Sequence, residues 1–219
     1  MSGAERVAFA VAALALAAAA PGTLRAAGID PLEALAFASG AAGVWLMTLE
    51  SAWGWPLGMA SCAALAVVFW GARLYADMAL QLGYVLLDAV GWWWWTRPRS
   101  AAAPLLVSRA PRTVALALVA GAVVVTPALT LLLRRLDDAA PFWDAFTTAL
   151  SLAGQLLLTR KHVEAWSVYA LVNVVYVGLY VARGLHPTAV LYGLFAAMTA
   201  VGASRWRREL TASPALAPG

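Results

Sequence analysis

The stretch RLYADMALQLGYVLLDAVGWWWW, from Arg73 to Trp95, decides how the rest of the chain is interpreted. As a helix with ~1.5 Å rise per residue, it is long enough to cross the ~30 Å hydrocarbon core of a bilayer. Four polar side chains recur in it at helical spacing and therefore share one face: Asp77, Gln81, Tyr84 and Asp88. A polar face inside a membrane helix is costly unless it faces protein or water, so this face is a candidate functional site. The closing run Trp92–Trp95 is expected to anchor the helix at the membrane interface.

The composition places the whole chain in a membrane. Of its 219 residues 63% are hydrophobic and 12% are charged, against about 45–50% and about 25% in soluble domains. The net charge of +4 comes from Lys and Arg between apolar segments, where they set topology rather than bind nucleic acid. A single cysteine, Cys62, excludes an intramolecular disulfide and a multi-cysteine metal site. Because the chain has no phosphate-binding loop and no recognisable acyl-transfer nucleophile, we expect no enzyme and no bound cofactor or metal.

Eight apolar segments of about 20 residues predict an all-α polytopic membrane protein. They cover residues 6–24, 31–49, 55–72, 74–95, 113–133, 142–159, 165–182 and 187–206. The first segment also has the pattern of a secretory signal peptide, but its basic start is thin, so we expect a retained helix. Ten of the fifteen Lys and Arg residues then fall on one side of the membrane and five on the other. This bias predicts that both termini are cytoplasmic.

Matching residues recur at an offset of 111, which predicts two copies of a three-helix unit. The pairs are Trp55 and Trp166, Leu74 and Leu185, Leu80 and Leu191, Gly91 and Gly202, and Trp95 and Trp206. Because one further helix separates the copies, we expect them to be parallel, with the substrate site at their interface near the midplane. The predicted regions are an extra N-terminal helix (1–27), a first repeat (28–96), a cytoplasmic loop with a linker helix (97–140), a second repeat (141–208) and a disordered tail (209–219).

A second polar and aromatic stripe follows one face of the 165–182 segment. Its members are three or four residues apart: Trp166, Tyr169, Asn173, Tyr176 and Tyr180. Aromatic faces suit a flat ring and an amide suits its polar edge, so the stripe is a candidate cavity wall. The same residues could instead hold helices together, with Asn173 bonded across to a neighbour. Gln81 and its counterpart Tyr192, 111 residues later, lie at equivalent depths and predict a cavity shared by the two copies.

The two carboxylates of the 74–95 segment have different interpretations. A cavity-facing Asp88 could take up a proton during transport, whereas a structural Asp88 would hydrogen-bond a neighbouring helix. Its repeat counterpart, Thr199, carries no charge. Asp77, nearer the outer end, is interpreted as a solvated vestibule residue.

These residues resemble the PnuC-type nicotinamide riboside transporters, within the wider Pnu family of vitamin-precursor transporters. The resemblance covers residues from about 31 to 208 and is carried by LYADMALQLGYVLLDAVGWWWW, PFWDAFTTALSLAGQLLLTRKHVEAWSVYALVNVV and GASRW. It implies a SWEET-like 3+1+3 arrangement of helices with a variable extra N-terminal helix. It also implies facilitated diffusion across the inner (plasma) membrane, a homo-oligomer that we expect to be a trimer, and a cytoplasmic kinase that phosphorylates the imported substrate.

In the family the cavity is built from aromatic and amide residues, and Gln81, Trp166 and Asn173 match that pattern. The substrate-binding residues that we expect are Gln81, Trp166, Asn173, Tyr169, Tyr84, Tyr176, Tyr192 and Asp88. The chain departs from the family pattern at three positions. The family has Trp where this chain has Tyr169, and Asn where this chain has Ala165 and Ser61.

The leading hypothesis is uptake of nicotinamide riboside with alternating access. The departures from the family pattern leave thiamine, riboflavin or a deoxynucleoside open as the substrate. Proton-coupled import through Asp88, and a non-transporting membrane scaffold or sensor, remain alternatives.

Overall fold

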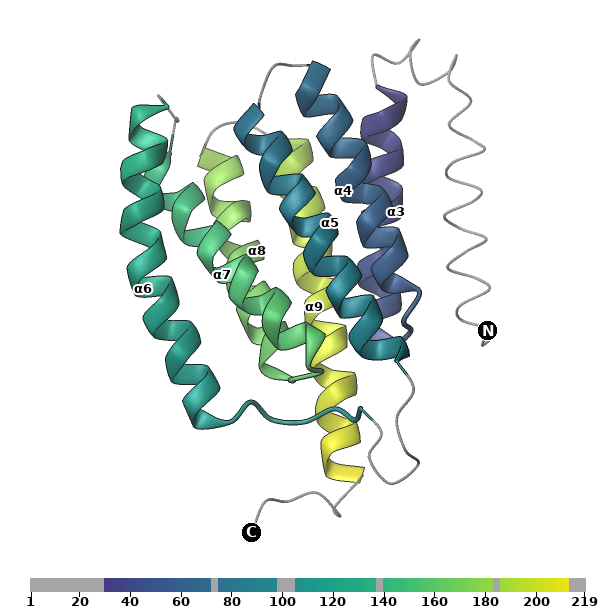
Figure 1. Cartoon of the computed structure of the whole chain (residues 1–219). Helices are drawn as coiled ribbons and strands as arrows, with labels where there is room; N and C mark the ends of the chain where they lie inside the picture. Colours follow the sequence, from purple (N-terminus) through teal and green to yellow (C-terminus); the bar gives the residue numbers. More distant parts are fainter. Residues whose placement is uncertain (1–29, 72–74, 98–104, 137–139, 183–185, 213–219) are drawn as a thin grey trace. The chain divides into compact units, whose positions relative to one another are not determined.

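A computed structural model of the chain describes residues 30–71, 75–97, 105–136, 140–182 and 186–212 (Figure 1). Within these ranges the chain forms α-helices and no named strand, as predicted. The helices are α3 (Pro31–Thr48), α4 (Gly54–Gly71), α5 (Tyr75–Thr96), α6 (Arg112–Arg135), α7 (Pro141–Thr159), α8 (Glu164–Ala182) and α9 (His186–Ala212). The predicted helix 6–24, and the region 1–27 that contains it, lie outside the described residues.

The described helices begin and end within two residues of the predicted segments, except at the end of α9. This helix continues to Ala212, so the predicted disordered tail is helical over residues 209–212. The reason is that Arg207, Arg208, Glu209 and Leu210 are all good helix formers and extend the helix beyond its apolar part.

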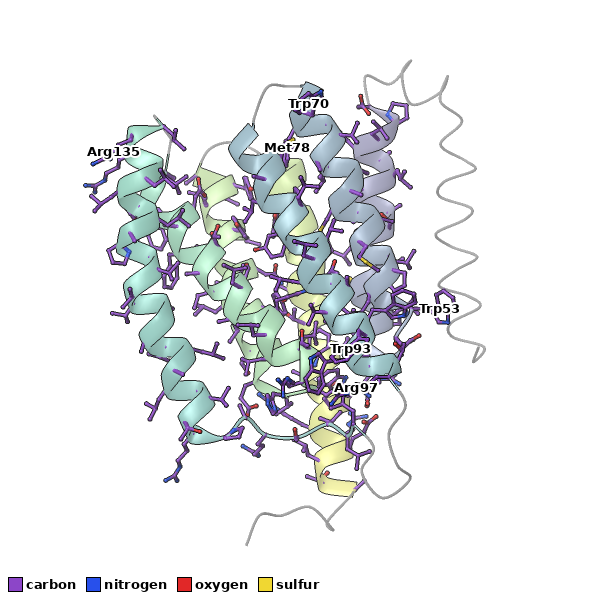
Figure 2. All side chains as sticks on the ribbon, viewed as in Figure 1. Trp53, Trp70, Met78, Trp93, Arg97 and Arg135 are labelled. Atoms are coloured by element: carbon purple, nitrogen blue, oxygen red, sulfur yellow. The ribbon has the colours of Figure 1, made fainter. Side chains whose placement is uncertain are left out.

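Three of the described helices, α4, α6 and α8, are long and apolar enough to cross a membrane by length and composition. Helix α5 is longer than α4 but less apolar, because its 22 residues include two aspartates, a glutamine and the tryptophan run. Exposed tryptophans mark both ends of the first unit: Trp53 and Trp93 lie at one end and Trp70 at the other (Figure 2). This is the placement expected of aromatic residues at the two membrane interfaces.

The chain divides into two compact units, Met1–Pro98 and Arg99–Gly219. In the first unit α4 packs against both α3 and α5. In the second, α8 packs against both α7 and α9, and α6 packs against α7. The helix that we predicted as a linker is therefore part of the second compact unit.

Local signals in the sequence explain where α3 begins. The side chain of Asp30 accepts a hydrogen bond from Leu32 N–H at 2.6 Å, and Pro31 occupies the first turn, where no backbone donor is needed. Glu33 in the same turn complements the positive end of the helix dipole.

Two helix ends that are 111 residues apart have the same backbone structure. After α3, Glu50 adopts a left-handed conformation with φ 55°, and the next N–H donates to Leu46 O at 3.0 Å. After α7, Lys161 has φ 56°, and the next N–H donates to Leu157 O at 2.9 Å. Both ends have the 6→1 hydrogen bond of a Schellman motif, although neither left-handed residue is the usual glycine.

In the first unit, Trp55 of α4 is fully buried against α5. Its ring lies over Gly91, where an added Cβ would overlap the indole. It also meets Trp95 edge to face, with ring centroids 5.4 Å apart and an interplanar angle of 86°. Trp95 therefore packs the two helices together, which corrects its predicted role as an interfacial anchor alone.

The preceding part of the tryptophan run fits the predicted anchor. Trp92 and Trp93 are exposed. The guanidinium carbon of Arg97 lies 5.0 Å from the ring centroid of Trp93 and 3.6 Å from that of Trp94 (Figure 2). A cation over one exposed and one half-buried indole ring suits a membrane interface, where such rings are half in lipid and the charge is in water.

The second unit repeats the tryptophan–glycine contact with the residues 111 positions later. Trp166 of α8 is 2% exposed and lies over Gly202 of α9, where an added Cβ would be 2.6 Å from Cε2 of the indole. It meets Trp206 edge to face at 5.3 Å and 89°. Trp206 is fully buried, so it belongs to the interior of the unit.

Candidate functional site

The polar face of α5 packs against α4 at Asp88. The Asp88 side chain is 7% exposed. Its Oδ2 lies against Gly58 of α4, where an added Cβ would be only 2.7 Å away, so a larger residue would not fit. Tyr84 and Gln81, one and two turns earlier, are half-buried. The side chain of Asp77 lies outside the described residues. A buried carboxylate in a membrane helix makes this face a functional candidate rather than a surface stripe.

The predicted stripe on α8 lies on the inward side of that helix. Trp166 and Asn173 are buried, whereas Leu171 and Val174, on the other side, are exposed. The stripe therefore lies between α7 and α9, the two helices against which α8 packs.

Tyr169 is held by α7. Its hydroxyl donates a hydrogen bond to Gln155 Oε1 at 2.6 Å, and its ring lies over Gly154, where an added Cβ would be 3.1 Å from Cζ. Gln155 is 9% exposed. Sequence reasoning missed Gln155, although a signal was available, because the chain has only two glutamines and both lie within predicted spans. This hydrogen bond joins α8 to α7, as expected if the stripe holds helices together.

Tyr176, Tyr180 and Tyr192 form a tyrosine cluster between α8 and α9. The centroid of Tyr176 lies 5.7 Å from that of Tyr180 and 4.6 Å from that of Tyr192, and the Tyr180 and Tyr192 rings stack at 5.3 Å. Thr147 of α7, which sequence reasoning also missed, donates to the Tyr176 hydroxyl at 3.0 Å. The cluster offers flat aromatic faces with hydroxyl groups at their edges, which suits an aromatic ligand with polar substituents.

The charge of the helix interiors suits a neutral or cationic ligand. In the described helices Lys and Arg occur only in the first or last turn of α6 and in the last eight residues of α9. Asp88 is a buried carboxyl group within α5. Among the described residues no group of three His, Cys, Asp or Glu side chains could hold a metal ion. The candidate residues are thus an amide, a tyrosine and a carboxyl group in the first unit, and aromatic rings, amides and hydroxyls in the second.

At one end of the second unit, the segment before α6 is tied to the α7–α8 connection. Ser108 N–H donates to Lys161 O at 3.0 Å, and the Ser108 hydroxyl lies 3.0 Å from His162 Nδ1. Ala110 N–H donates to the Glu164 carboxylate at 2.9 Å. Burial lowers the pKa of His162 from its ordinary value of 6.5, Glu164 opposes this shift, and Arg160 adds to it. This end of the predicted loop is therefore part of the folded unit.

Comparisons with known proteins agree on one group of transporters. The sequence profile of the family described as nicotinamide mononucleotide transporters matches residues 30–208. The nicotinamide riboside transporter PnuC of Escherichia coli (strain K12) is 25% identical over 201 residues, covering 80% of this chain and 84% of the relative. The protein of the same name from Shigella flexneri matches with the same values. A crystal structure of the vitamin B3 transporter PnuC has a TM-score of 0.70 at 20% identity, covering 96% of this chain and 93% of that one.

Proposed function

The chain belongs to the nicotinamide mononucleotide transporter family, and on that premise we propose that it imports nicotinamide riboside by facilitated diffusion. The observation that carries this proposal is the family match over residues 30–208. The relatives named for transport of the riboside, and the shared fold, support it. A transporter of this family is an integral membrane protein and not an enzyme.

The riboside suits the candidate site better than the nucleotide. A phosphate group is normally bound by Arg or Lys. In the described helices these residues occur only at the ends of α6 and in the last eight residues of α9. Nicotinamide riboside has no phosphate, and its pyridinium ring carries one positive charge. The buried Asp88 can offset that charge where water is excluded.

We assign direct contacts with the substrate to the half-buried tyrosines and to the two amide side chains of the predicted site. The tyrosine cluster stacks on the nicotinamide ring, and Gln81 and Asn173 hydrogen-bond the carboxamide or ribose. Tyr84 lies one turn from Gln81 and contributes its ring. Because Trp166 is 2% exposed and packs on α9, we assign it a positioning role in place of direct stacking. Tyr169, bonded to Gln155, has the same role toward α7.

Alternating access is proposed to arise from two parallel three-helix units and the linker helix α6, the 3+1+3 arrangement. The repeated helix ends and the repeated tryptophan–glycine contacts support this proposal, since the same local structure and packing recur 111 residues apart. Rocking of one unit against the other would then open the site to either side. The resemblance to the family further supports a trimer in the inner membrane, with cytoplasmic termini and a cytoplasmic kinase that traps the substrate.

Uptake measurements test the proposal. In a bacterium without its own uptake system, expression of the chain should produce saturable uptake of labelled nicotinamide riboside. Unlabelled nicotinamide mononucleotide, thiamine, riboflavin and deoxynucleosides should compete weakly. Asn173→Ala and Gln81→Ala should each abolish uptake at an unchanged level in the membrane, whereas the exposed Leu171→Ala should transport normally. Normal uptake by both site variants would refute the site, and no riboside uptake at all would refute the substrate.

Proton-coupled import is a second candidate, favoured by the 7% exposure of the Asp88 carboxyl group. It requires that dissipating the proton gradient stops uptake and that Asp88→Asn transports without coupling. Facilitated diffusion instead predicts that uptake persists without the gradient. It also predicts that Asp88→Asn raises KM for the cationic riboside, because the opposite charge is lost.

A further inference from the structure

A deep groove runs along the second unit between α6, α7 and α8, and its volume is about 620 Å³. Leu118 and Ala122 of α6, Phe146 and Leu150 of α7, and Val168 of α8 are among the residues that line it. Of the described lining residues, only Thr126 and Glu164 carry polar side chains. A nucleoside or another polar solute would lose its hydrogen bonds in such a groove, so its ligand must be apolar over most of its length.

The lining residues show that the groove is long. On α6 it extends from Ala115 to Pro127 and on α7 from Phe142 to Leu157, which is about 20 Å at ~1.5 Å per residue. Half of the ~30 Å hydrocarbon core is about 15 Å, the depth reached by the chains of one leaflet. The dimensions therefore fit an extended hydrocarbon chain that enters from one membrane surface.

Basic residues flank one end of the groove in the sequence. Ala110, at this end, lies between the exposed residues Arg109 and Arg112. Leu157, at the same end, is closely followed by Arg160 and Lys161. The carboxylate of Glu164 also lies there, and it accepts a hydrogen bond from Ala110 N–H at 2.9 Å. Four basic residues are thus close in sequence to the residues that line this end of the apolar groove, where the Glu164 carboxylate lies.

We propose that this groove binds a phospholipid, with an acyl chain between α6 and the α7–α8 pair and an anionic head group at Arg109 and Arg112. Basic pockets between membrane helices recognise anionic lipid head groups, and the cytoplasmic leaflet attracts such basic residues. Helix α6 is suited to this role because most of its surface is exposed and apolar. This lipid site is separate from the candidate transport site and does not depend on the identity of the substrate.

The head-group part of the proposal is tested with the purified, delipidated full-length chain in detergent. Native mass spectrometry should show binding of phosphatidylglycerol at lower concentration than phosphatidylcholine of the same acyl chains. In Arg109→Ala/Arg112→Ala, affinity for phosphatidylglycerol should fall about fivefold for each arginine removed, since a basic residue near an anionic surface contributes ~1 kcal/mol. Arg134→Ala/Arg135→Ala, at the other end of α6, is the matched control and should bind as the wild type does. Equal binding of the two lipids by the wild type would overturn the proposal.

The acyl-chain part is tested by filling the groove. Ala122→Phe places a ring among the lining residues, whereas Val124→Phe places one on an exposed position of the same helix. The first variant should lose the bound phospholipid and the second should retain it. If Ala122→Phe keeps the lipid, the proposal is wrong. If it keeps the lipid and loses the oligomer, the groove is a contact between copies of the chain.

Discussion

Gly202 shows how one missing side chain sets the distance between two helices. Because an added Cβ would lie 2.6 Å from the Trp166 ring, Gly202→Ala requires α9 or the indole to move. Overpacking of this kind destabilises by about 1–3 kcal/mol. We therefore expect a lower apparent melting temperature for the purified protein in detergent, measured by tryptophan fluorescence.

Gly193 provides the matched control on the same helix. An added Cβ there has no neighbour within 4 Å, and Ala is a better helix former than Gly by about 1 kcal/mol. Gly193→Ala should therefore melt at the same temperature or higher. If Gly202→Ala and Gly193→Ala melt together, the close contact at Trp166 does not limit stability.

Sequence reasoning found most of the candidate residues but not what they touch. The 111-residue offset paired Trp55 with Trp166 and Gly91 with Gly202, yet a repeat shows which positions are equivalent and not which ones are in contact. The spacing on α8 correctly placed its stripe on one inward face. It could not identify Gln155 as the partner of Tyr169, because that hydrogen bond depends on how α7 and α8 pack.

At the scale of elements, the α7–α8 connection contains a titratable contact. Burial lowers the pKa of His162 below 6.5, so the unfolded chain binds this proton more readily than the folded one. Above the unfolded pKa the group is neutral in both states and has no effect on stability. As the pH falls from about 6.5 towards the lowered folded pKa, the folded state should lose stability.

The measurement is the apparent melting temperature against pH for the wild type and for His162→Gln, which cannot titrate. The wild type should lose more stability than the variant between neutral and mildly acidic pH. Parallel curves for the two proteins would show that protonation of His162 does not weaken the contact with Ser108.

Element bounds were predictable where hydrophobicity changes sharply, and less so elsewhere. Asp30 and Pro31 mark the start of α3 by local chemistry that is visible in the sequence. The predicted end of α9 was wrong. The apolar pattern indicates where a span leaves the membrane, whereas the helix continues for as long as its residues favour helical structure. The backbone pairing of Ser108 with the α7–α8 connection was missed, since its partner lies 54 residues away.

At the scale of the whole molecule, the family predicted from motifs is confirmed by the profile match over residues 30–208. The all-helical fold class, and the seven helices of the described residues, were also accessible, because each span must satisfy its own backbone hydrogen bonds in lipid and therefore forms a helix. The groove proposed to bind a lipid was not accessible from the sequence. The residues that line it come from three helices and the segment before α6, and they look like ordinary lipid-facing positions.

The orientation of α6 gives a prediction for the whole molecule. Its 24 residues extend about 36 Å, more than the ~30 Å hydrocarbon core, so its ends should emerge on opposite sides. With Cys62→Ser as background, Arg109→Cys and Arg135→Cys place single thiols at exposed positions near these ends.

The positive-inside bias predicts that a membrane-impermeant maleimide labels Arg135→Cys in intact cells and Arg109→Cys only in inverted vesicles. Val124→Cys, exposed at mid-helix, should react from neither side because it faces lipid. Labelling of both ends from one side would show that α6 does not span the membrane. The reverse pattern would place the basic mouth of the groove in the outer leaflet.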